Sequence, residues 1–181
     1  MVGFSQNSKK NVAKDFNSYM ETLVNKEFAK TVEYHPEFVF QSTSKKQMIQ
    51  GLEKTYNNPA FTFKIDSYAI DKIGRAYKSD SLFYRVIKYQ VNMNKKLNSL
   101  DKKSAKDKEA FLRILEMQLL SQYGFGNVTL NKKTDFFKIK EKSKVCAISK
   151  DGIKDWKFIV LNYEQRESLK LLLPKKLHKE L

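Results

Sequence analysis

Residues 82–93, with the sequence LFYRVIKYQVNM, decide the fold class, because large apolar side chains recur at every second position, with strict apolar–polar alternation from Ile87 to Met93. One face of an extended strand here carries large apolar side chains and one arginine: Phe83, Arg85, Ile87, Tyr89, Val91 and Met93. A period of two is typical of a strand that is buried on one side. The stretch therefore predicts a long, half-buried strand.

Other strands are predicted on both sides of this one, at residues 37–42, 61–65, 135–140, 144–149 and 156–161. After Ile65 the alternation changes phase, which predicts a bulge or a bend near Ser67–Ala69. Lys150-Asp151-Gly152 is a turn sequence between two such strands and predicts a hairpin. The late strands thus indicate an antiparallel series.

Helices are predicted mainly before the strands. Apolar residues at helical spacing indicate helices over residues 8–23, 28–32, 44–56, 111–124 and 164–173, with Ser8 and Ser44 as N-caps. The residue before Pro36 is restricted to extended geometry, so the second helix should end there. Helices early and an antiparallel series late predict an α+β fold, with a curved antiparallel sheet packed on the N-terminal helices and a short C-terminal helix.

The chain length of 181 residues predicts a single domain, with boundaries at residues 8 and 175 and a tail over 176–181. The Lys-rich stretch 94–108 is expected to be a mobile loop. Residues 1–7 are interpreted either as a disordered start or as the remnant of a signal peptide, since Gly3 and Ser5 are small residues before a suitable cleavage point. We favour export to the periplasm or the outside, with the cytoplasm as the alternative.

The composition is strongly basic, with 35 Lys and Arg against 20 Asp and Glu and a formal net charge of +15. Only four of the basic residues are Arg, the side chain that binds phosphates and bases bidentately. We therefore interpret most of the charge as a solvated surface. The single Cys146 and the two distant histidines predict no metal site, and no apolar run is long enough to span a membrane.

Three stretches carry a resemblance to a known superfamily: Phe16-Asn17-Ser18-Tyr19-Met20, residues 34–40 followed by 46–52, and Asp155-Trp156-Lys157-Phe158-Ile159. The chain resembles the nuclear-transport-factor-2-like superfamily, which includes ketosteroid isomerase and SnoaL-type cyclases, and looks most similar to uncharacterised exported bacterial members. The resemblance implies a cone-shaped, cystatin-like fold with a cavity between helices and sheet. Residues 94–135 depart from the pattern and are expected to be an insertion.

The same resemblance suggests two catalytic schemes, neither of which the residues complete. Tyr19 is placed like the hydrogen-bond donor of the isomerases, and Glu33 or Glu37 is the nearest match to their base. The second acid has no counterpart, because residues 82–93 contain no Asp or Glu. A cyclase-type site would need His35. We expect no catalytic residue and no cofactor, and we interpret the chain as a non-catalytic binding domain rather than an isomerase-like or cyclase-like enzyme.

A ligand pocket is predicted around amphipathic aromatic residues: Tyr19, Tyr34, His35, Tyr89 and Trp156. The alternative is that these side chains fill the core. The expected ligand is a small apolar or amphipathic molecule or a protein partner, and a homodimer through the open sheet face is a further expectation from the resemblance.

An anion-binding surface is the alternative function. Lys138, Lys140, Lys142 and Lys144 alternate, so in a continuous strand they would line one face about 6.6 Å apart. That spacing suits the phosphates of an extended nucleic acid or another anionic polymer. The scarcity of Arg makes a nucleic acid or an anionic surface the less favoured partner.

Overall fold

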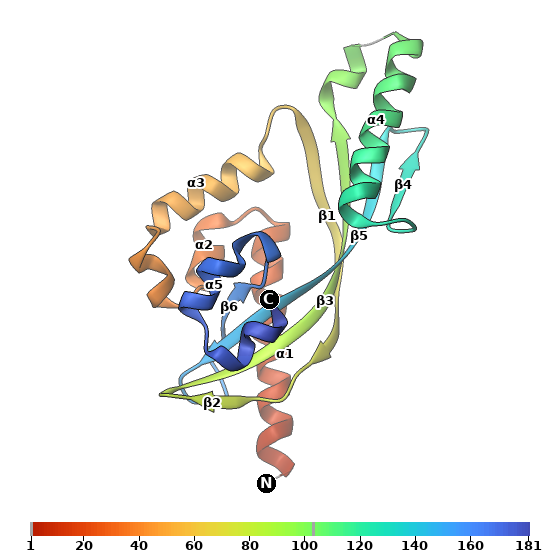
Figure 1. Ribbon diagram of the computed structural model, residues 1–181. Helices are drawn as coiled ribbons and strands as arrows, with labels where there is room; N and C mark the ends of the chain where they lie inside the picture. The colour runs from red at the N-terminus through yellow and green to blue at the C-terminus, as the bar shows by residue number, and fades with distance from the viewer. Residues whose placement is uncertain (1, 103) are drawn as a thin grey trace. The chain divides into compact units, whose positions relative to one another are not determined.

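The computed structural model describes residues 2–102 and 104–181, and Figure 1 shows its helices and strands. The helices are α1 (Val2–Val24), α2 (Phe28–Glu33), α3 (Lys45–Tyr56), α4 (Ala105–Tyr123) and α5 (Arg166–Leu172), with 3-10 turns η1 (Glu37–Gln41), η2 (Asn98–Lys102), η3 (Tyr163–Gln165) and η4 (Lys175–Glu180). The strands are β1 (Phe61–Ile73), β2 (Tyr77–Ser79), β3 (Leu82–Leu97), β4 (Val128–Asn131), β5 (Phe136–Ser149) and β6 (Lys157–Val160). None of the described helices is long and apolar enough to cross a membrane.

The strands form one open antiparallel sheet in the order β1-β3-β5-β4, with β2 paired to β3 and β6 paired to β5. β5 and β6 are antiparallel neighbours, with Val145 opposite Val160 and Ile148 opposite Lys157, so the predicted hairpin around Lys150-Asp151-Gly152 is confirmed. The α+β class with a curved antiparallel sheet and N-terminal helices is confirmed as well.

The chain divides into two compact units. Unit 1 contains Met1–Ile49, Ile70–Tyr89 and Ser143–Leu181, and unit 2 contains Gln50–Ala69 and Gln90–Lys142. The residues expected to form an insertion, 94–135, all fall in unit 2.

The core of unit 1 contains the predicted apolar stripe of α1, whose members are all buried: Val12, Phe16, Tyr19, Met20 and Leu23. A second buried cluster joins the sheet to the C-terminal segment and contains Tyr84, Cys146, Ile148, Ile159, Leu161, Leu169, Leu173 and Leu177. Leu177 belongs to η4, so the predicted tail over 176–181 contributes to the core. Lys144 also pairs with Glu180 of this segment.

The core of unit 2 is smaller and lies between strands and α4. Its buried apolar residues are Val91, Met93, Leu100, Leu115, Leu119, Val128, Phe137 and Ile139. Val128 and Ile139 are opposite each other in the β4–β5 ladder. The alternating burial of β5 in this unit leaves Lys138, Lys140 and Lys142 exposed.

The first helix begins at Val2 rather than at Ser8. Ser8 therefore does not act as an N-cap; it is buried, and its hydroxyl donates a hydrogen bond to the Gly152 carbonyl. The part of the N-terminal prediction that concerns Met1 lies outside the described residues. By contrast, the Ser44 cap is confirmed as a capping box, in which the Gln47 amide donates to Ser44 Oγ at 3.2 Å and the Ser44 amide donates to Gln47 Oε1 at 3.0 Å.

The expected strand over residues 37–42 is wrong, because this segment forms the 3-10 turn η1. The Val39 amide donates to the Pro36 carbonyl at 3.0 Å, and the Ser42 amide to the Val39 carbonyl at 3.4 Å. These bonds reach three residues back, which is the 3-10 pattern. The apolar alternation of Phe38 and Phe40 misled the prediction, because burial does not alternate in the turn: Phe38, Val39 and Phe40 are all half-buried.

The expectation of a loop over residues 94–108 is also wrong, because most of its described residues lie in β3, η2 and α4. β3 continues to Leu97, and η2 and α4 follow; Lys103 lies outside the described residues. Polar side chains hold this extension to β1, since Asn94 Nδ2 donates to Asp66 Oδ2 at 2.5 Å and Thr62 Oγ1 donates to Asn98 Oδ1 at 2.7 Å. After Met93, where the apolar alternation ends, side-chain hydrogen bonds to β1 therefore keep β3 extended.

Two predicted strands, 135–140 and 144–149, form the single strand β5. The backbone is hydrogen-bonded on either side of the polar residues between them: the Lys140 amide donates to the Asn127 carbonyl at 2.8 Å, and the Lys144 carbonyl accepts from the Leu161 amide at 2.9 Å. β1 is continuous, and its exposure pattern shifts where both Asp66 and Ser67 are exposed, close to the predicted change of phase.

Candidate functional site

The predicted aromatic residues of α1 and the α2–η1 connection lie close together in unit 1. The Tyr19 ring is 5.9 Å from the Tyr34 ring and 6.1 Å from the His35 ring, and it stacks on Phe158 at 5.3 Å, measured between centroids. Tyr19 is 4% exposed. These contacts fill the space between the rings, as aromatic side chains do in a packed core.

Tyr89 and Trp156 join the same region by different contacts. Tyr89 packs edge to face on Phe16 at 5.0 Å, and Phe16 packs in the same way on Phe158 at 5.6 Å. Trp156 is fully buried; its indole N–H donates to the Ile153 carbonyl at 3.2 Å, and its backbone amide donates to Asp15 Oδ2 at 3.0 Å. Tyr19, Tyr34 and Tyr89 thus contact Phe16 or Phe158, which the sequence analysis did not place at the site.

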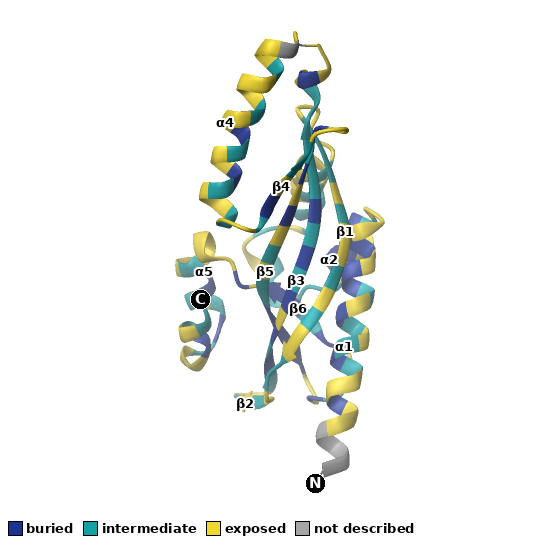
Figure 2. Cartoon of the chain, turned by 90° about the vertical axis from the view of Figure 1, so that its right-hand side faces the viewer, coloured by how far each residue is buried: buried dark blue, intermediate teal, exposed yellow. Residues whose placement is uncertain are grey.

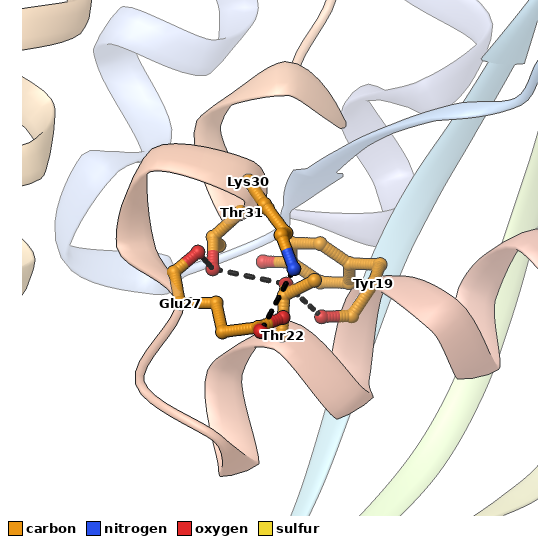
Figure 3. Close-up of polar contacts among 5 residues, drawn as sticks. All are labelled: Tyr19, Thr22, Glu27, Lys30 and Thr31. Carbon is orange, nitrogen blue, oxygen red and sulfur yellow. Dashed lines mark hydrogen bonds and ion pairs between the residues drawn. The ribbon is translucent and has the colours of Figure 1, made fainter.

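A pair of buried threonines fixes the position of Tyr19. Thr31 Oγ1 of α2 donates to Thr22 Oγ1 at 2.9 Å, and the Thr22 hydroxyl donates to the Tyr19 carbonyl at 2.7 Å (Figure 3). Lys30 and Glu27 form an ion pair beside them at 2.8 Å. The turn from α1 to α2 is therefore held by hydroxyl groups that water does not reach.

His35 is half-buried at the edge of this cluster. Its Nδ1 is buried and has no hydrogen-bond partner among the described residues. Burial lowers the pKa of His35, because the charged imidazolium loses hydration. The imidazole is thus kept neutral at neutral pH.

The acids considered for an isomerase-type site do not face Tyr19. Glu33 is exposed and paired with Lys45 at 2.9 Å, which lowers the pKa of the Glu33 carboxyl group through that hydrogen bond. Glu37 is exposed on η1. A base for proton abstraction would need to lie within hydrogen-bond distance of a substrate held at Tyr19.

A pocket of about 650 Å³ lies in unit 1. Some of its lining residues are sequence neighbours of the predicted aromatic residues, but the aromatic residues themselves do not line it. Its apolar lining consists of Pro36, Phe38, Leu82 and Ile148, and its polar lining consists of Glu37, Gln41, Ser149, Lys150, Asp151, Lys154, Asp155 and Lys157. The volume lies in the range of small-molecule sites. None of the five predicted aromatic residues lines it, although Pro36 follows His35 and both Asp155 and Lys157 adjoin Trp156.

The loop that forms one wall of this pocket is held by the side chain of Asp151. Its Oδ1 accepts hydrogen bonds from the Ile153 amide at 2.7 Å, the Lys154 amide at 3.0 Å and Ser149 Oγ at 3.0 Å. The backbone hydrogen bonds from Lys154 and Ile153 lower the pKa of the Asp151 carboxyl group. The wall is thus an ordered turn with an ionised carboxylate at its centre.

Arg85 supports the same loop from below the surface. It is 3% exposed; Nη1 donates to the Gly74 carbonyl at 3.0 Å and Nη2 donates to Ser8 Oγ at 2.9 Å. Ser8 in turn donates to Gly152 of the loop. One arginine among apolar residues on one face of residues 82–93 was the available sequence signal for this network; the contact with Ser8, 77 positions away, had none.

The four lysines predicted to bind anions are not equivalent. Lys138, Lys140 and Lys142 are exposed on β5, as the alternation required. Lys144 is half-buried, and its Nζ donates to the Glu180 carbonyl at 2.6 Å and pairs with the Glu180 carboxylate at 3.3 Å. Its charge is therefore already engaged.

Among the described residues, no group of three or more His, Cys, Asp or Glu side chains could hold a metal ion. No protein-family model, curated protein or solved structure matches the chain. The argument for function therefore depends on the residues of the pocket and of the surface.

Proposed function

We propose that this chain is a non-catalytic binding protein that holds a small amphipathic molecule with an anionic head group in the pocket of unit 1. The pocket itself carries the proposal: apolar side chains line its interior, and Lys150, Lys154 and Lys157 stand among its polar residues. An apolar body would contact Phe38, Leu82 and Ile148, where burial contributes about 25 cal/mol per Å² of apolar surface.

The charge of the whole chain, rather than that of the lining, favours an anionic head group over a cationic one. Three lysines and three acids line the pocket; Lys157 Nζ donates to the Glu33 carbonyl at 2.7 Å, and Asp151 accepts three hydrogen bonds from its own loop. Lys150 and Lys154 are exposed beside it, and the chain as a whole carries +15. A positive potential of this size raises the local concentration of anions.

A binding role also fits the proposed membership in the nuclear-transport-factor-2-like superfamily, because the chemistry for catalysis is incomplete. Asp151 stays ionised and occupied by its loop, and His35 is not part of the pocket lining. Such a fold carries binding proteins and enzymes alike, so the residues of the site decide between them.

The test is calorimetric titration of the protein with dodecanoate and with uncharged dodecanol. We expect one dodecanoate per chain and weaker binding of dodecanol. Gln41→Trp should fill the pocket from an exposed lining position and weaken dodecanoate binding at least about tenfold, which corresponds to about 1.4 kcal/mol. Gln50→Trp, an exposed glutamine of α3 outside the lining, is the matched control and should bind like the wild type.

The head-group position is tested separately with a Lys150→Glu/Lys154→Glu double variant. It should lose affinity for dodecanoate and keep its affinity for dodecanol. The proposal is overturned if neither compound binds, or if Gln41→Trp binds both as tightly as the wild type. Native mass spectrometry of protein purified without denaturant gives a second readout, since a retained small-molecule mass would support an occupied pocket.

Binding of an anionic polymer is a second candidate, and the exposure of Lys138, Lys140 and Lys142 on one strand favours it. Affinity for single-stranded nucleic acid should then fall steeply with salt concentration. A Lys138→Gln/Lys140→Gln/Lys142→Gln variant that binds such a polymer as tightly as the wild type would exclude this surface.

A further inference from the structure

Helix α4 carries an apolar stripe that is exposed to solvent. Phe111 is 42% exposed, Ile114 55% and Met117 71%. Residues three positions apart lie on neighbouring turns of one helix face. These three side chains therefore lie next to one another on the helix surface. Single apolar residues scattered over a surface would not recur at every third position of one helix.

The opposite side of α4 already supplies its packing. Leu115 and Leu119 are buried, and the helix contacts β4 within unit 2. Figure 2 shows this division, with exposed residues along one side of α4 and buried or intermediate residues along the other. The helix is therefore apolar on two sides, one of them buried in the unit and the other exposed.

The segment after α4 exposes another large apolar side chain. Phe125 is 89% exposed and lies between Gly124 and Gly126, whose φ angles are +87° and +81°. Such angles are accessible to glycine at little cost. The chain thus turns sharply on both sides of an aromatic residue that is left almost fully exposed.

The surroundings of the stripe are basic. Unit 2 contains fourteen basic and eight acidic residues, which leaves a formal net charge of +6. Lys106 and Arg113 are exposed and lie seven residues apart, on one side of the helix, and Arg113 forms an exposed ion pair with Glu109 at 2.7 Å. Asp107 is engaged in the N-terminal cap, where its amide donates to Ser104 Oγ at 3.2 Å and its carboxylate accepts from the same hydroxyl at 2.6 Å.

We infer that the exposed face of α4, formed by Phe111, Ile114 and Met117, docks on an anionic lipid surface, with the helix lying in the plane of the head groups. Helices of this kind bury apolar side chains at the boundary of the acyl chains and place basic side chains among anionic head groups. Each basic residue near such a surface adds to the attraction.

A second copy of the chain is a poorer occupant for two reasons. The stripe covers two helical turns, whereas a stable protein interface uses about 20 to 30 residues on each side. Two chains that each carry +15 also repel each other, while a surface of opposite sign attracts both. Lipid insertion requires no complementary surface of matching shape.

The test is flotation of the full chain with vesicles of phosphatidylcholine alone and of phosphatidylcholine with phosphatidylglycerol. We expect binding only to the vesicles that contain phosphatidylglycerol, and weaker binding as salt concentration rises. Ile114→Glu/Met117→Glu should reduce this binding at least about tenfold, because two charges replace the inserted side chains. Leu171→Glu on α5, at a position 89% exposed, is the matched control and should bind like the wild type.

Three outcomes would overturn the inference. They are no binding to either vesicle, equal binding to both, and unchanged binding of the Ile114→Glu/Met117→Glu variant. Sedimentation velocity tests whether a second copy of the chain binds the stripe instead. If the wild type is a dimer and the Ile114→Glu/Met117→Glu variant is a monomer, the stripe serves self-association. The pocket lies in the other unit, so failure here leaves the proposed small-molecule binding intact and the converse also holds.

Discussion

The guanidinium carbon of Arg85 lies 5.7 Å from the centre of the Trp156 ring, in a region where both side chains are buried. The Arg85 Nε has no hydrogen-bond partner among the described residues, and burial lowers the pKa of the group. Among the described residues, the guanidinium group contacts an aromatic face, a carbonyl and a hydroxyl, and it forms no ion pair with a carboxylate. A planar cation suits this environment, because it stacks and donates at once.

Two substitutions of Arg85 distinguish what its charge contributes to stability from what its planar shape contributes. Arg85→Lys keeps a buried charge that neither stacks nor reaches both acceptors, so we expect a loss of about 3 kcal/mol in the free energy of unfolding. Arg85→Met removes the desolvated charge along with the hydrogen bonds and should cost only about 1–2 kcal/mol. Urea unfolding measures both; a methionine variant less stable than the lysine variant would contradict this account.

Gly152 is expected to be intolerant of a side chain for two separable reasons. Its φ is +73°, and a Cβ would lie 2.8 Å from the Phe83 ring. Gly126 has a similar φ of +81°, but a Cβ there would meet no atom within 4 Å, so Gly126→Ala should cost only about 1 kcal/mol in unfolding free energy. Gly152→Ala should cost about 1–3 kcal/mol more, because the ring must move. Equal losses for the two variants in urea unfolding would exclude the steric part.

Much of the fold is predictable from local sequence, because its signals are periodic. The buried stripe of α1, the capping box at Ser44 and the alternating face of β3 each follow from a spacing of side chains. The failures include the N-cap assigned to Ser8, the strand expected at η1 and the loop expected at residues 94–97. Ser8 and residues 94–97 are held by hydrogen-bond partners that are distant in sequence. Local spacing carries no information about such partners.

The candidate site was predictable only in part, for a related reason. Tyr19 contacts both Tyr34 and His35, and the rings of Tyr19 and Tyr34 also pack on Phe158. The pocket instead uses charged residues of the loop after β5, which in sequence look like an ordinary hairpin turn. Whether aromatic side chains fill a space or leave it open depends on packing in three dimensions, and a one-dimensional pattern does not record it.

Cys146 is expected to be chemically silent in the folded protein. The thiol is fully buried, and burial raises its pKa, so the reactive thiolate is scarce. We expect no labelling by iodoacetamide under native conditions and complete labelling in urea. Rapid labelling of the native protein would show that the core cluster around Cys146 opens readily.

Asp151 should give the protein an acid-sensitive contribution to stability. Its pKa is lowered in the folded state by hydrogen bonds to its loop, so the unfolded state binds its proton more readily. The contribution is fully present above the unfolded pKa of about 3.9 and is lost as pH falls through the lower folded value. Asp151→Asn should therefore be less stable than the wild type at neutral pH, and the difference should shrink in acid.

Thermal unfolding over a pH series measures this effect, and Asp71→Asn, at an exposed aspartate of β1, is the control. The control should show no comparable difference from the wild type. A difference for Asp151→Asn that persists unchanged below the folded pKa would mean that the amide disturbs the loop sterically, and the electrostatic account would fail.

His35 should contribute in the same direction but near neutral pH. Burial lowers its folded-state pKa below the unfolded value of about 6.5, so the unfolded state takes up the proton first as pH falls. Stability is thus highest above that value and decreases as pH falls toward the folded pKa.

The half-buried ring contacts Tyr19 and has an unpartnered Nδ1, so among the described contacts no acid stabilises the imidazolium. His35→Gln removes the titrating group and should flatten this part of the stability profile, while His178→Gln should leave it in place. If the slope between about pH 5 and 7 is the same in His35→Gln and in the wild type, another group is responsible, and the imidazole of His35 is more hydrated than its burial indicates.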